Sequence, residues 1–403
     1  MRVLNGLLFL GGSQLQVPGI RWATEAGFDV YLVDREQNAA GQRFAKEFFC
    51  VDVCDWDEIY HQLDITGNLK KIHCIYASSD FGLQTVAHLN EALGLKGVNK
   101  AQASLLLDKD ATNRQLEARG VKVPKILGRL TPQIFDFENI KYPVVVKPSI
   151  GSGSVGVTVA ISPDELEPAM DVAKRLGGVP IIEEYVEGTH IDVSGFVLGG
   201  TFRRGGLLVR FFTGGAKRVP TWGHQPSLVS SQQESEIYSQ LELAAHILGL
   251  KNTPLKADIV LTQDGPCLIE VSARFHGDVS SSFVAPRAYG LSPLQNWFGA
   301  LRGLKVDYEG FDKLPKKLQG WAAILSGRIG TLLAVSGIAE ASETTGVQEV
   351  LIRRLPGHHI DSTDDNRAVI GFIFAEAGTP DALGKILDTA INRIQLEFGG
   401  PTP

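Results

Sequence analysis

Cysteine is scarce in this sequence, which has only four cysteines among 403 residues, at positions 50, 54, 74 and 267. They form no CxxC pair and are too few for a disulfide scaffold, so a disulfide framework is excluded and a zinc site is disfavoured. We therefore expect buried thiols in a protein from a reducing compartment.

An excess of positive charge is also missing, because 39 Lys and Arg residues oppose 45 Asp and Glu residues, for a formal net charge of -6. A protein without a basic field has no general means of holding a phosphate polymer, so nucleic acid is not an expected partner. Small anionic ligands stay open, since a local site can oppose the net sign.

Long apolar runs are absent as well, because no stretch approaches the roughly 20 residues that a membrane span requires. The opening MRVLNGLLFLGGS contains a short apolar run, but no small-residue cleavage site follows it. We interpret it as a buried strand that ends in a glycine turn rather than as a signal peptide. The sequence thus favours a cytoplasmic protein with no membrane partner.

What is present is enough apolar sequence for a large core, since 44% of the residues are hydrophobic. The length suggests about three units. Strand and helix alternate over residues 1–105, which predicts a Rossmann-like domain with a parallel sheet, including a helix near Gln42 to Phe48. Its first turn reads GGSQLQ and not GxGxxG, so no dinucleotide site is predicted there.

A second unit is predicted over residues 106–300, with a lid subdomain at about 120–185, and a third, α+β unit over 301–403. The lid is expected to contain the strands VKVPK, YPVVVKPS, VTVAI and VPIIEEYV. The third unit is expected to close with an amphipathic helix over PDALGKILDTAINRIQLEF. The predicted fold class is therefore α/β combined with α+β.

A glycine and serine loop, Gly151 to Gly156, matches GxGxxG by letter. A dinucleotide loop must lead into a helix, whereas the VTVAI that follows is β-branched and apolar, as in a strand. A glycine loop between antiparallel strands can instead fold over a nucleotide, with backbone N–H groups and serine hydroxyls reaching phosphate oxygens. The alternative is a flexible hairpin loop without a ligand.

Two further features accompany this loop. Lys147 follows apolar residues at the end of a strand, where burial requires an anionic partner, either phosphate or a structural salt bridge. Asp258 and Glu270 lie on the two strands of the hairpin KADIVLTQDGPCLIEVS, and their even spacing allows both to point to one face. With Arg274 nearby, such a carboxylate pair suits Mg²⁺, although an exposed polar pair is the alternative. Since no GxxxxGK[ST] string occurs, the pieces together indicate ATP bound without a P-loop.

At this point the chain resembles the ATP-grasp superfamily, and within it the carboxylate-amine ligases, which include bacterial L-amino-acid ligases and biotin carboxylase. The resemblance covers nearly the whole chain. LLLDKDATNRQLEARG places Lys109 at the first ATP lysine, and VVVKPSIGSGSVGV places Lys147 at the second. The same resemblance makes Ser152, Gly153 and Ser154 part of a mobile phosphate flap.

The segment IIEEYVEG resembles the hinge that holds adenine. The resemblance implies that Glu183 accepts from the adenine amino group, that the backbone of Glu184 and Val186 pairs with the ring edge, and that Tyr185 packs nearby. His190 falls near ribose or phosphate.

KADIVLTQDGPCLIEVSARFHGD resembles the magnesium hairpin, with Asp258 and Glu270 as metal ligands. Arg274 would then contact the transferred phosphoryl group or the developing oxyanion. Two positions depart from the family pattern, because Asp258 stands where glutamate is usual and Ser272 stands where many members have a ligating asparagine. The substrate is expected against four residues, namely His276, Gly277, Asp278 and Arg328, where the alternative for Arg328 is an exposed turn arginine.

The resemblance implies an ATP-dependent ligase that activates the carboxylate of an amino acid as an acylphosphate and joins it to an amine, releasing ADP and phosphate. It implies ATP and Mg²⁺ as cofactors, with Mn²⁺ as a substitute, small-molecule acid and amine substrates, and a homodimer. Three alternatives stay open: a bicarbonate-using enzyme like biotin carboxylase, a formate-using enzyme, suggested by the EVSxRxH pattern, and a non-catalytic ATP sensor.

One basic segment, GGTFRRGGLLVRFFTGGAKRVPTWGHQPS, has no assigned role. It could form an anion pocket with an aromatic wall or a solvated basic hairpin. Its candidates are Arg203, Arg204, Arg210, Arg218, Trp222 and His224. We favour solvent exposure for Arg203 and Arg204, which flank a glycine turn.

Overall fold

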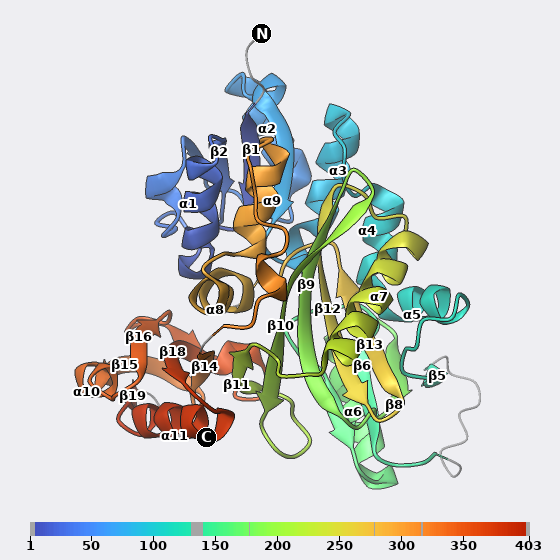
Figure 1. Ribbon diagram of the computed structural model, residues 1–403, viewed down its shortest axis with the longest axis vertical. Coiled ribbons are helices and arrows are strands. Elements are labelled where there is room, and N and C mark those ends of the chain that lie inside the picture. The colour runs from blue at the N-terminus through green and yellow to red at the C-terminus, as the bar shows by residue number, and fades with distance from the viewer. Residues whose placement is uncertain (1–4, 130–139, 177, 278, 316, 400–403) are drawn as a thin grey trace.

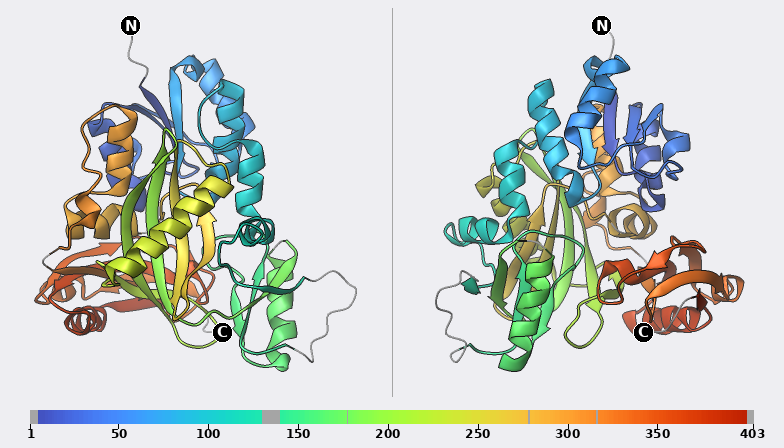
Figure 2. Two further views of the ribbon diagram at one scale, coloured as in Figure 1. Left: turned by 45° about the vertical axis from the view of Figure 1, so that its right-hand side comes forward. Right: turned by 180° about the vertical axis from the view of Figure 1, so that it is seen from behind.

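The computed structural model describes residues 5–129, 140–176, 178–277, 279–315 and 317–399 (Figure 1). The N-terminal unit lies at one end of the molecule, a long antiparallel sheet runs through the centre, and the C-terminal unit lies at the opposite end (Figures 1 and 2). The fold class is thus mixed α/β and α+β, as predicted.

The N-terminal unit is a parallel four-stranded sheet in the order β3-β2-β1-β4. Its strands are β1 (Gly6–Leu10), β2 (Asp29–Val33), β3 (Glu47–Phe49) and β4 (Ile72–Ala77). Its helices are α1 (Val17–Glu25), α2 (Trp56–Ile65) and α3 (Leu83–Leu93). A later helix, α9 (Pro293–Leu301), packs on α1 and adds Trp297 and Phe298 to the core around Phe9.

Two expectations for this unit are wrong. The helix near Gln42 to Phe48 is only a 3-10 turn, Gln42–Phe44, because Glu47–Phe49 extend the sheet beside β2. Cys50 and Cys54 are exposed rather than buried, since they lie in the turns that follow this edge strand.

The central sheet has eight strands in the order β13-β12-β9-β10-β11-β14-β18-β16, and every neighbouring pair is antiparallel. The strands are β9 (Thr189–Leu198), β10 (Thr201–Phe212), β11 (Pro220–Gln225), β12 (Thr253–Thr262), β13 (Gly265–Ser272), β14 (Leu318–Leu325), β16 (Val347–Ile352) and β18 (Val369–Ala377). Three helices cover its first strands: α4 (Lys100–Leu107), α5 (Lys109–Glu117) and α7 (Ser231–Ile247). Helix α7 crosses β9, β12 and β13 and buries Ile237 and Leu241 against them (Figure 2).

A separate four-stranded sheet, in the order β5-β8-β6-β7, stands beside the central sheet and carries the glycine loop. It contains β5 (Ile126–Arg129), β6 (Val144–Pro148), β7 (Thr158–Ala160) and β8 (Pro180–Glu184), with α6 (Pro163–Arg175) packed on it. The predicted strand VKVPK is wrong, because residues 121–125 are irregular and the strand begins at Ile126. Val121 and Val123 instead bury their side chains in the core beneath α7.

The C-terminal unit combines the last strands of the central sheet with a three-stranded sheet in the order β17-β15-β19. The small sheet contains β15 (Gly330–Ser336), β17 (His359–Ile360) and β19 (Gln395–Gly399). The expected closing helix is wrong in its second half. Helix α11 (Pro380–Ile391) ends where its buried stripe of Leu383, Leu387 and Ala390 ends, and the chain then pairs with β15 as β19.

The described part of the chain contains no helix that combines the length and the apolar character needed to cross a bilayer.

Candidate active site

A cavity of about 1580 Å³ opens where the N-terminal unit, the sheet β5-β8-β6-β7, the central sheet and the C-terminal unit meet. Every predicted site residue lines it except Asp278, which lies outside the described residues, and Arg328. The lining members are Lys109, Lys147, Ser152, Gly153, Ser154, Glu183, Glu184, Tyr185, Val186, His190, Asp258, Glu270, Arg274, His276 and Gly277. Residues separated by more than a hundred positions in the sequence therefore line one cavity.

The two hairpin carboxylates face the same point. Asp258 on β12 and Glu270 on β13 are direct partners in the antiparallel ladder, so their side chains lie on one face. The ammonium of Lys256 stands between them, 3.2 Å from Asp258 Oδ2 and 2.7 Å from Glu270 Oε2. A single cation therefore contacts both carboxylates in this structure.

Lys256 was not singled out from the sequence, and it is the most enclosed member of this group. Its side chain is 6% exposed, against 39% for Asp258 and 23% for Glu270. Burial alone would lower the pKa of Lys256, but Asp258 and Glu270 outweigh it and hold the pKa above its ordinary value. Burial likewise opposes ionisation of Asp258, and the charge of Lys256 outweighs it, so the pKa of that carboxyl is held below its ordinary value. The group is therefore charged throughout at neutral pH.

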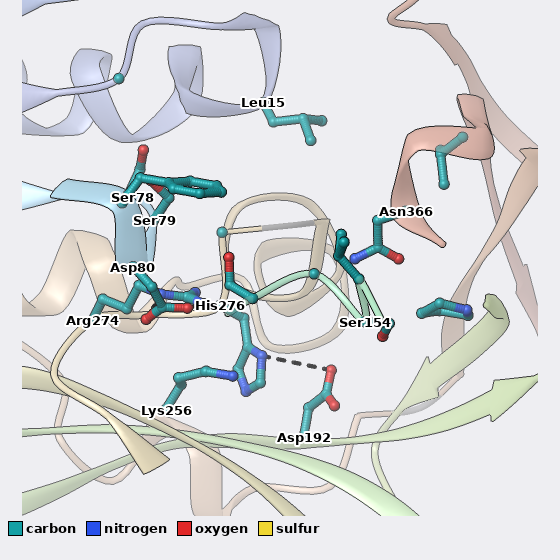
Figure 3. A pocket seen from close by; sticks show the side chains of 18 of the residues that line it. Leu15, Ser78, Ser79, Asp80, Ser154, Asp192, Lys256, Arg274, His276 and Asn366 are labelled. Atoms are coloured by element: carbon teal, nitrogen blue, oxygen red, sulfur yellow. Dashed lines mark hydrogen bonds and ion pairs between the residues drawn. The ribbon is translucent and has the colours of Figure 1, made fainter. Parts of the chain in front are cut away.

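Arg274 is held by a residue from the other side of the molecule, Asp80, which follows β4. Its Nε donates to Asp80 Oδ1 at 2.8 Å, and its Nη2 donates to Oδ2, which makes a bidentate pair (Figure 3). Burial would raise the pKa of Asp80, but Arg274 lowers it to about 2. Asp80 thus fixes the direction of the Arg274 side chain.

Ser272, the departure from the usual asparagine, is engaged in the same contact. Its hydroxyl donates to Asp80 Oδ1 at 2.6 Å and is buried. Ser272 therefore supports the Asp80–Arg274 pair. Because its hydroxyl is engaged with Asp80, we do not assign Ser272 as a metal ligand.

Lys147 makes the structural salt bridge that was the alternative to phosphate. Its Nζ lies 2.7 Å from Glu183 Oε2, and Asn113 Nδ2 donates to the other oxygen at 3.3 Å. Both partners of the salt bridge are almost fully buried and line the cavity. The Glu183 carboxylate already has two donors, so an adenine amino group would have to share it with them.

The glycine loop between β6 and β7 lines the cavity. Lys109 Nζ donates to the carbonyl of Gly151 and lies 3.5 Å from Glu270 Oε1, which links the loop to the carboxylate hairpin. Gly153 and Ser154 have φ values of 69° and 62°, a left-handed conformation that turns successive N–H groups toward one side. Asn366 of the C-terminal unit lies beside Ser154 (Figure 3).

The hinge segment after β8 forms another wall. Glu184 Oε1 accepts from the backbone N–H of Lys125 at 3.1 Å, and the hydroxyl of Tyr185 accepts from Arg218. His190 packs edge-on against Phe212, and burial, together with Arg218, lowers the pKa of His190 to about 4. His190 is therefore neutral at physiological pH.

His276 and Gly277 close the far end of the hairpin. His276 Nε2 lies 3.2 Å from the carbonyl of Val193, so that nitrogen carries the proton. Its Nδ1 faces Asp192 Oδ2 at 3.8 Å (Figure 3) and lies 3.9 Å from Asp258 Oδ1. These three residues are close enough together to be a candidate cation site, but Asp192 is already paired with Arg210. A Cβ on Gly277 would stand 2.3 Å from the carbonyl oxygen of Ser78, so only glycine fits there.

The structure does not bring Arg328 to the cavity. Its guanidinium lies over the ring of Phe398, 5.5 Å from the centroid, on the small sheet of the C-terminal unit. The residue expected near the substrate is therefore a packing residue, because β15 and β19 bring Phe398 beneath it.

The basic segment GGTFRRGGLLVRFFTGGAKRVPTWGHQPS lies partly in the cavity and partly outside it. Arg210 and Arg218 line the cavity, whereas Trp222 stacks on Phe211 outside it. Arg204 pairs with Asp312 at 3.0 Å, away from the cavity. Neither Arg203 nor His224 is among the lining residues.

Three family models match consecutive parts of the chain. Residues 20–97 match an ATP-grasp N-terminal domain, residues 106–278 match an ATP-grasp domain, and residues 323–399 match the L-amino acid ligase C-terminal domain 2.

Similar proteins and structures agree with these matches. An L-amino acid ligase from Bacillus licheniformis superposes with a TM-score of 0.83 over 99% of this chain and 100% of that one, at 18% identity. The chain is 24% identical over 357 residues to the uncharacterized protein y4rH of Sinorhizobium fredii, which spans 85% of this chain and 72% of that protein. It is 28% identical over 145 residues to a D-alanine--D-alanine ligase of Bacillus anthracis, covering 35% of this chain and 46% of that enzyme.

Proposed function

Because this chain is an ATP-grasp protein, we propose that it is an ATP-dependent ligase that activates a carboxylate as an acylphosphate and couples it to an amine, giving ADP and phosphate. The acid we propose is an amino acid. The observation that carries the proposal is the shared cation position of Asp258 and Glu270, placed between Lys109 and Arg274 in one cavity.

The donor set fits a magnesium ion. Asp258 and Glu270 offer hard carboxylate oxygens that already converge on one cationic atom, and both carboxylates are reachable from the cavity. Asp258 and Glu270 would hold the ion, with Mn²⁺ as a substitute. When bound, it would neutralise charge on the terminal phosphates of ATP.

The side chains around the carboxylates would position the nucleotide. Lys109 and the N–H groups of the glycine loop line the cavity and would contact phosphate oxygens, and Glu184, Tyr185 and Val186 line the wall proposed for adenine. A substrate carboxylate oxygen then attacks the γ-phosphorus in line, a new P–O bond forms, and the bond to the β-phosphate oxygen breaks to release ADP. Arg274, fixed by Asp80, would offset the charge that builds on the transferred group.

The second step consumes the acylphosphate. The amine nitrogen attacks its carbonyl carbon, the C–O bond to phosphate breaks, inorganic phosphate leaves, and the nitrogen loses a proton. Because Nε2 of His276 is committed to the carbonyl of Val193, only Nδ1 of that ring could accept the proton. Binding the amine in its neutral form would serve equally.

Water must be kept from the acylphosphate between the two steps. The Lys109–Gly151 contact and the approach of Asn366 to Gly153 hold the glycine loop across the cavity. We propose that this loop closes after ATP binds and opens to release products.

We also propose that the enzyme works in the cytoplasm as a homodimer, a state that analytical ultracentrifugation would measure directly.

A phosphate-release screen with ATP and Mg²⁺ across amino acids, simple acids and amines tests the proposed reaction. The proposal predicts ADP formation that requires both an acid and an amine. Turnover with bicarbonate alone or formate alone would instead indicate the corresponding alternative enzyme. ATP binding by calorimetry without turnover for any pair would indicate a sensor.

A further inference from the structure

The cavity is lined by many cationic side chains, and most of them have a carboxylate partner within the protein. The paired ones are Arg35 with Glu36 and Asp52, Lys109 with Glu270, Lys147 with Glu183, Arg210 with Asp192, Lys256 with Asp258 and Glu270, and Arg274 with Asp80. Two others, Arg43 and Arg218, lie against the rings of Phe44 and Tyr185. The cavity is thus close to charge balance over most of its wall.

Among the described residues, Arg353 and Arg354 have neither kind of partner. Both line the cavity directly after strand β16, and neither takes part in any ion pair among the described residues. The Nε of Arg354 is buried and has no hydrogen-bond partner in the part of the chain that the structure describes. Two adjacent guanidinium groups therefore share one wall of the cavity without a counter-charge.

The acidic groups of the neighbouring elements are committed elsewhere. Asp361 and Asp365 pair with Arg367, and Asp364 lies 3.9 Å from Lys217. Glu349, on β16 itself, pairs with Arg287. None of these carboxylates can neutralise the arginine pair without breaking a contact of its own.

The backbone holds the pair in place. The N–H groups of Arg353 and Arg354 both donate to the carbonyl of Ile370, at 2.9 and 3.0 Å. Ile370 is fully buried and belongs to β18, a strand of the central sheet in which every residue except Glu376 is buried. The two side chains therefore start from a rigid position, which lowers the conformational cost of gripping a ligand.

The surroundings make the unbalanced charge costly. Leu351, Val369 and Phe372 line the cavity beside the pair, so little polar surface is available to solvate it. Burial and the neighbouring charge of Arg354 lower the pKa of Arg353 to about 10. An anion that bound both arginines would relieve this repulsion, and the planar donor forks of arginine suit oxoanions.

We propose that Arg353 and Arg354 bind a doubly charged oxoanion, either a phosphate monoester or a pair of carboxylates, carried by one substrate of the ligase at the end remote from the bond that forms. This inference rests on the proposed function for its reaction. The nucleotide is the less suitable occupant, because the glycine loop and Lys109, which we assign to its phosphates, belong to the β6–β7 connection and to helix α5, whereas the arginine pair comes from the C-terminal unit.

Matched substrates test the proposal. O-phosphoserine and serine would be offered as acid or amine with ATP and Mg²⁺, whereas glutamate and glutamine, and aspartate and asparagine, would be offered as the amine, so that both carboxylates of the dicarboxylic acids stay free. We expect kcat/KM for the anionic member to exceed that of its neutral partner by at least tenfold. The phosphate and dicarboxylate arms distinguish the two sources of the anion.

Variants locate the effect. Arg353→Gln and Arg354→Gln should each raise KM for the anionic substrate at least tenfold while leaving the affinity for ADP unchanged. Arg354→Lys keeps the positive charge at position 354, so its KM for the anionic substrate should lie between those of wild type and Arg354→Gln. Arg393→Gln, an exposed arginine of the same unit outside the cavity, is the matched control and should behave like wild type.

Binding is measured separately, so that failure of the reaction does not hide the site. With saturating ADP and Mg²⁺, O-phosphoserine should raise the melting temperature more than serine does, and Arg353→Gln should abolish the difference. Absence of any difference in wild type, or its persistence in Arg353→Gln, would overturn the arginine-pair site. A ligase that uses neutral and anionic substrates equally would do the same, whereas binding without turnover for any pair would overturn the proposed function alone.

Discussion

Replacing Lys256 by glutamine should expose how strongly the carboxylate hairpin depends on a cation. The substitution keeps most of the side-chain volume but leaves Asp258 and Glu270 facing each other without the ammonium that lies 3.2 and 2.7 Å from them. Removing one partner of a buried ion pair costs roughly 3–5 kcal/mol. Because the two carboxylates are 39% and 23% exposed, solvent screens them and we expect the low end, about 3 kcal/mol.

The assay is urea unfolding of the Lys256→Gln variant and wild type at neutral pH, with and without MgCl₂. Mg²⁺ should stabilise the variant more than wild type, because the ion no longer competes with an ammonium for the same oxygens. Lys122→Gln is the control, since Lys122 is an exposed lysine near the same hairpin whose ammonium donates to the Thr262 hydroxyl and the Asp264 carbonyl rather than to a carboxylate. A loss below about 1 kcal/mol, or an equal response of both proteins to Mg²⁺, would refute the shared cation position.

Three further substitutions test the rest of the site. Glu270→Gln should slow ADP formation at least a hundredfold while changing nucleotide affinity far less, as measured by single-turnover kinetics and calorimetry; wild-type rates would remove Glu270 from the site. Asp80→Asn should release Arg274 and lower kcat. The pKa of Asp80 is depressed to about 2 in the folded protein, so its ionised form adds about 2 kcal/mol to the free energy of unfolding above pH 4, and this contribution is lost as the pH falls toward 2. The free energy of unfolding of the Asp80→Asn variant should lack this pH dependence. A pH profile equal to that of wild type would contradict the Asp80–Arg274 pairing. Gly277→Ala should destabilise the protein by roughly 1–3 kcal/mol, because its Cβ would stand 2.3 Å from the Ser78 carbonyl oxygen, and a thermal melt superimposable on wild type would show that the turn yields.

Local patterns were sufficient to predict the hairpin and the glycine loop. The even spacing of Asp258 and Glu270 and a single tight turn leave little choice of register, so a common face followed from the alternation of strand side chains. The same alternation places Lys256 in phase with Asp258, a signal that could have identified it. The strand after the glycine loop was also readable, because β-branched residues follow it directly.

Contacts between distant segments were not readable in the same way. Asp80 and Arg274 are separated by 194 positions, and nothing near either residue indicates the other. Arg353 and Arg354 lie in a polar turn that looks exposed in the sequence, and only the packing of β16 against β18 turns them toward the cavity. The prediction of the closing helix was wrong for a related reason. The segment QLEF continues an amphipathic pattern, but it pairs with β15 as a strand, a contact that the local sequence does not reveal.

The transfer of an oxygen atom tests carboxylate activation most directly. An acid substrate labelled with ¹⁸O in its carboxylate would be turned over with ATP, Mg²⁺ and an amine, and the released phosphate analysed by mass spectrometry. Attack of the carboxylate on the γ-phosphorus predicts one ¹⁸O atom in each phosphate molecule. Phosphate without the label would mean that water attacks the nucleotide, and it would contradict the ligase mechanism.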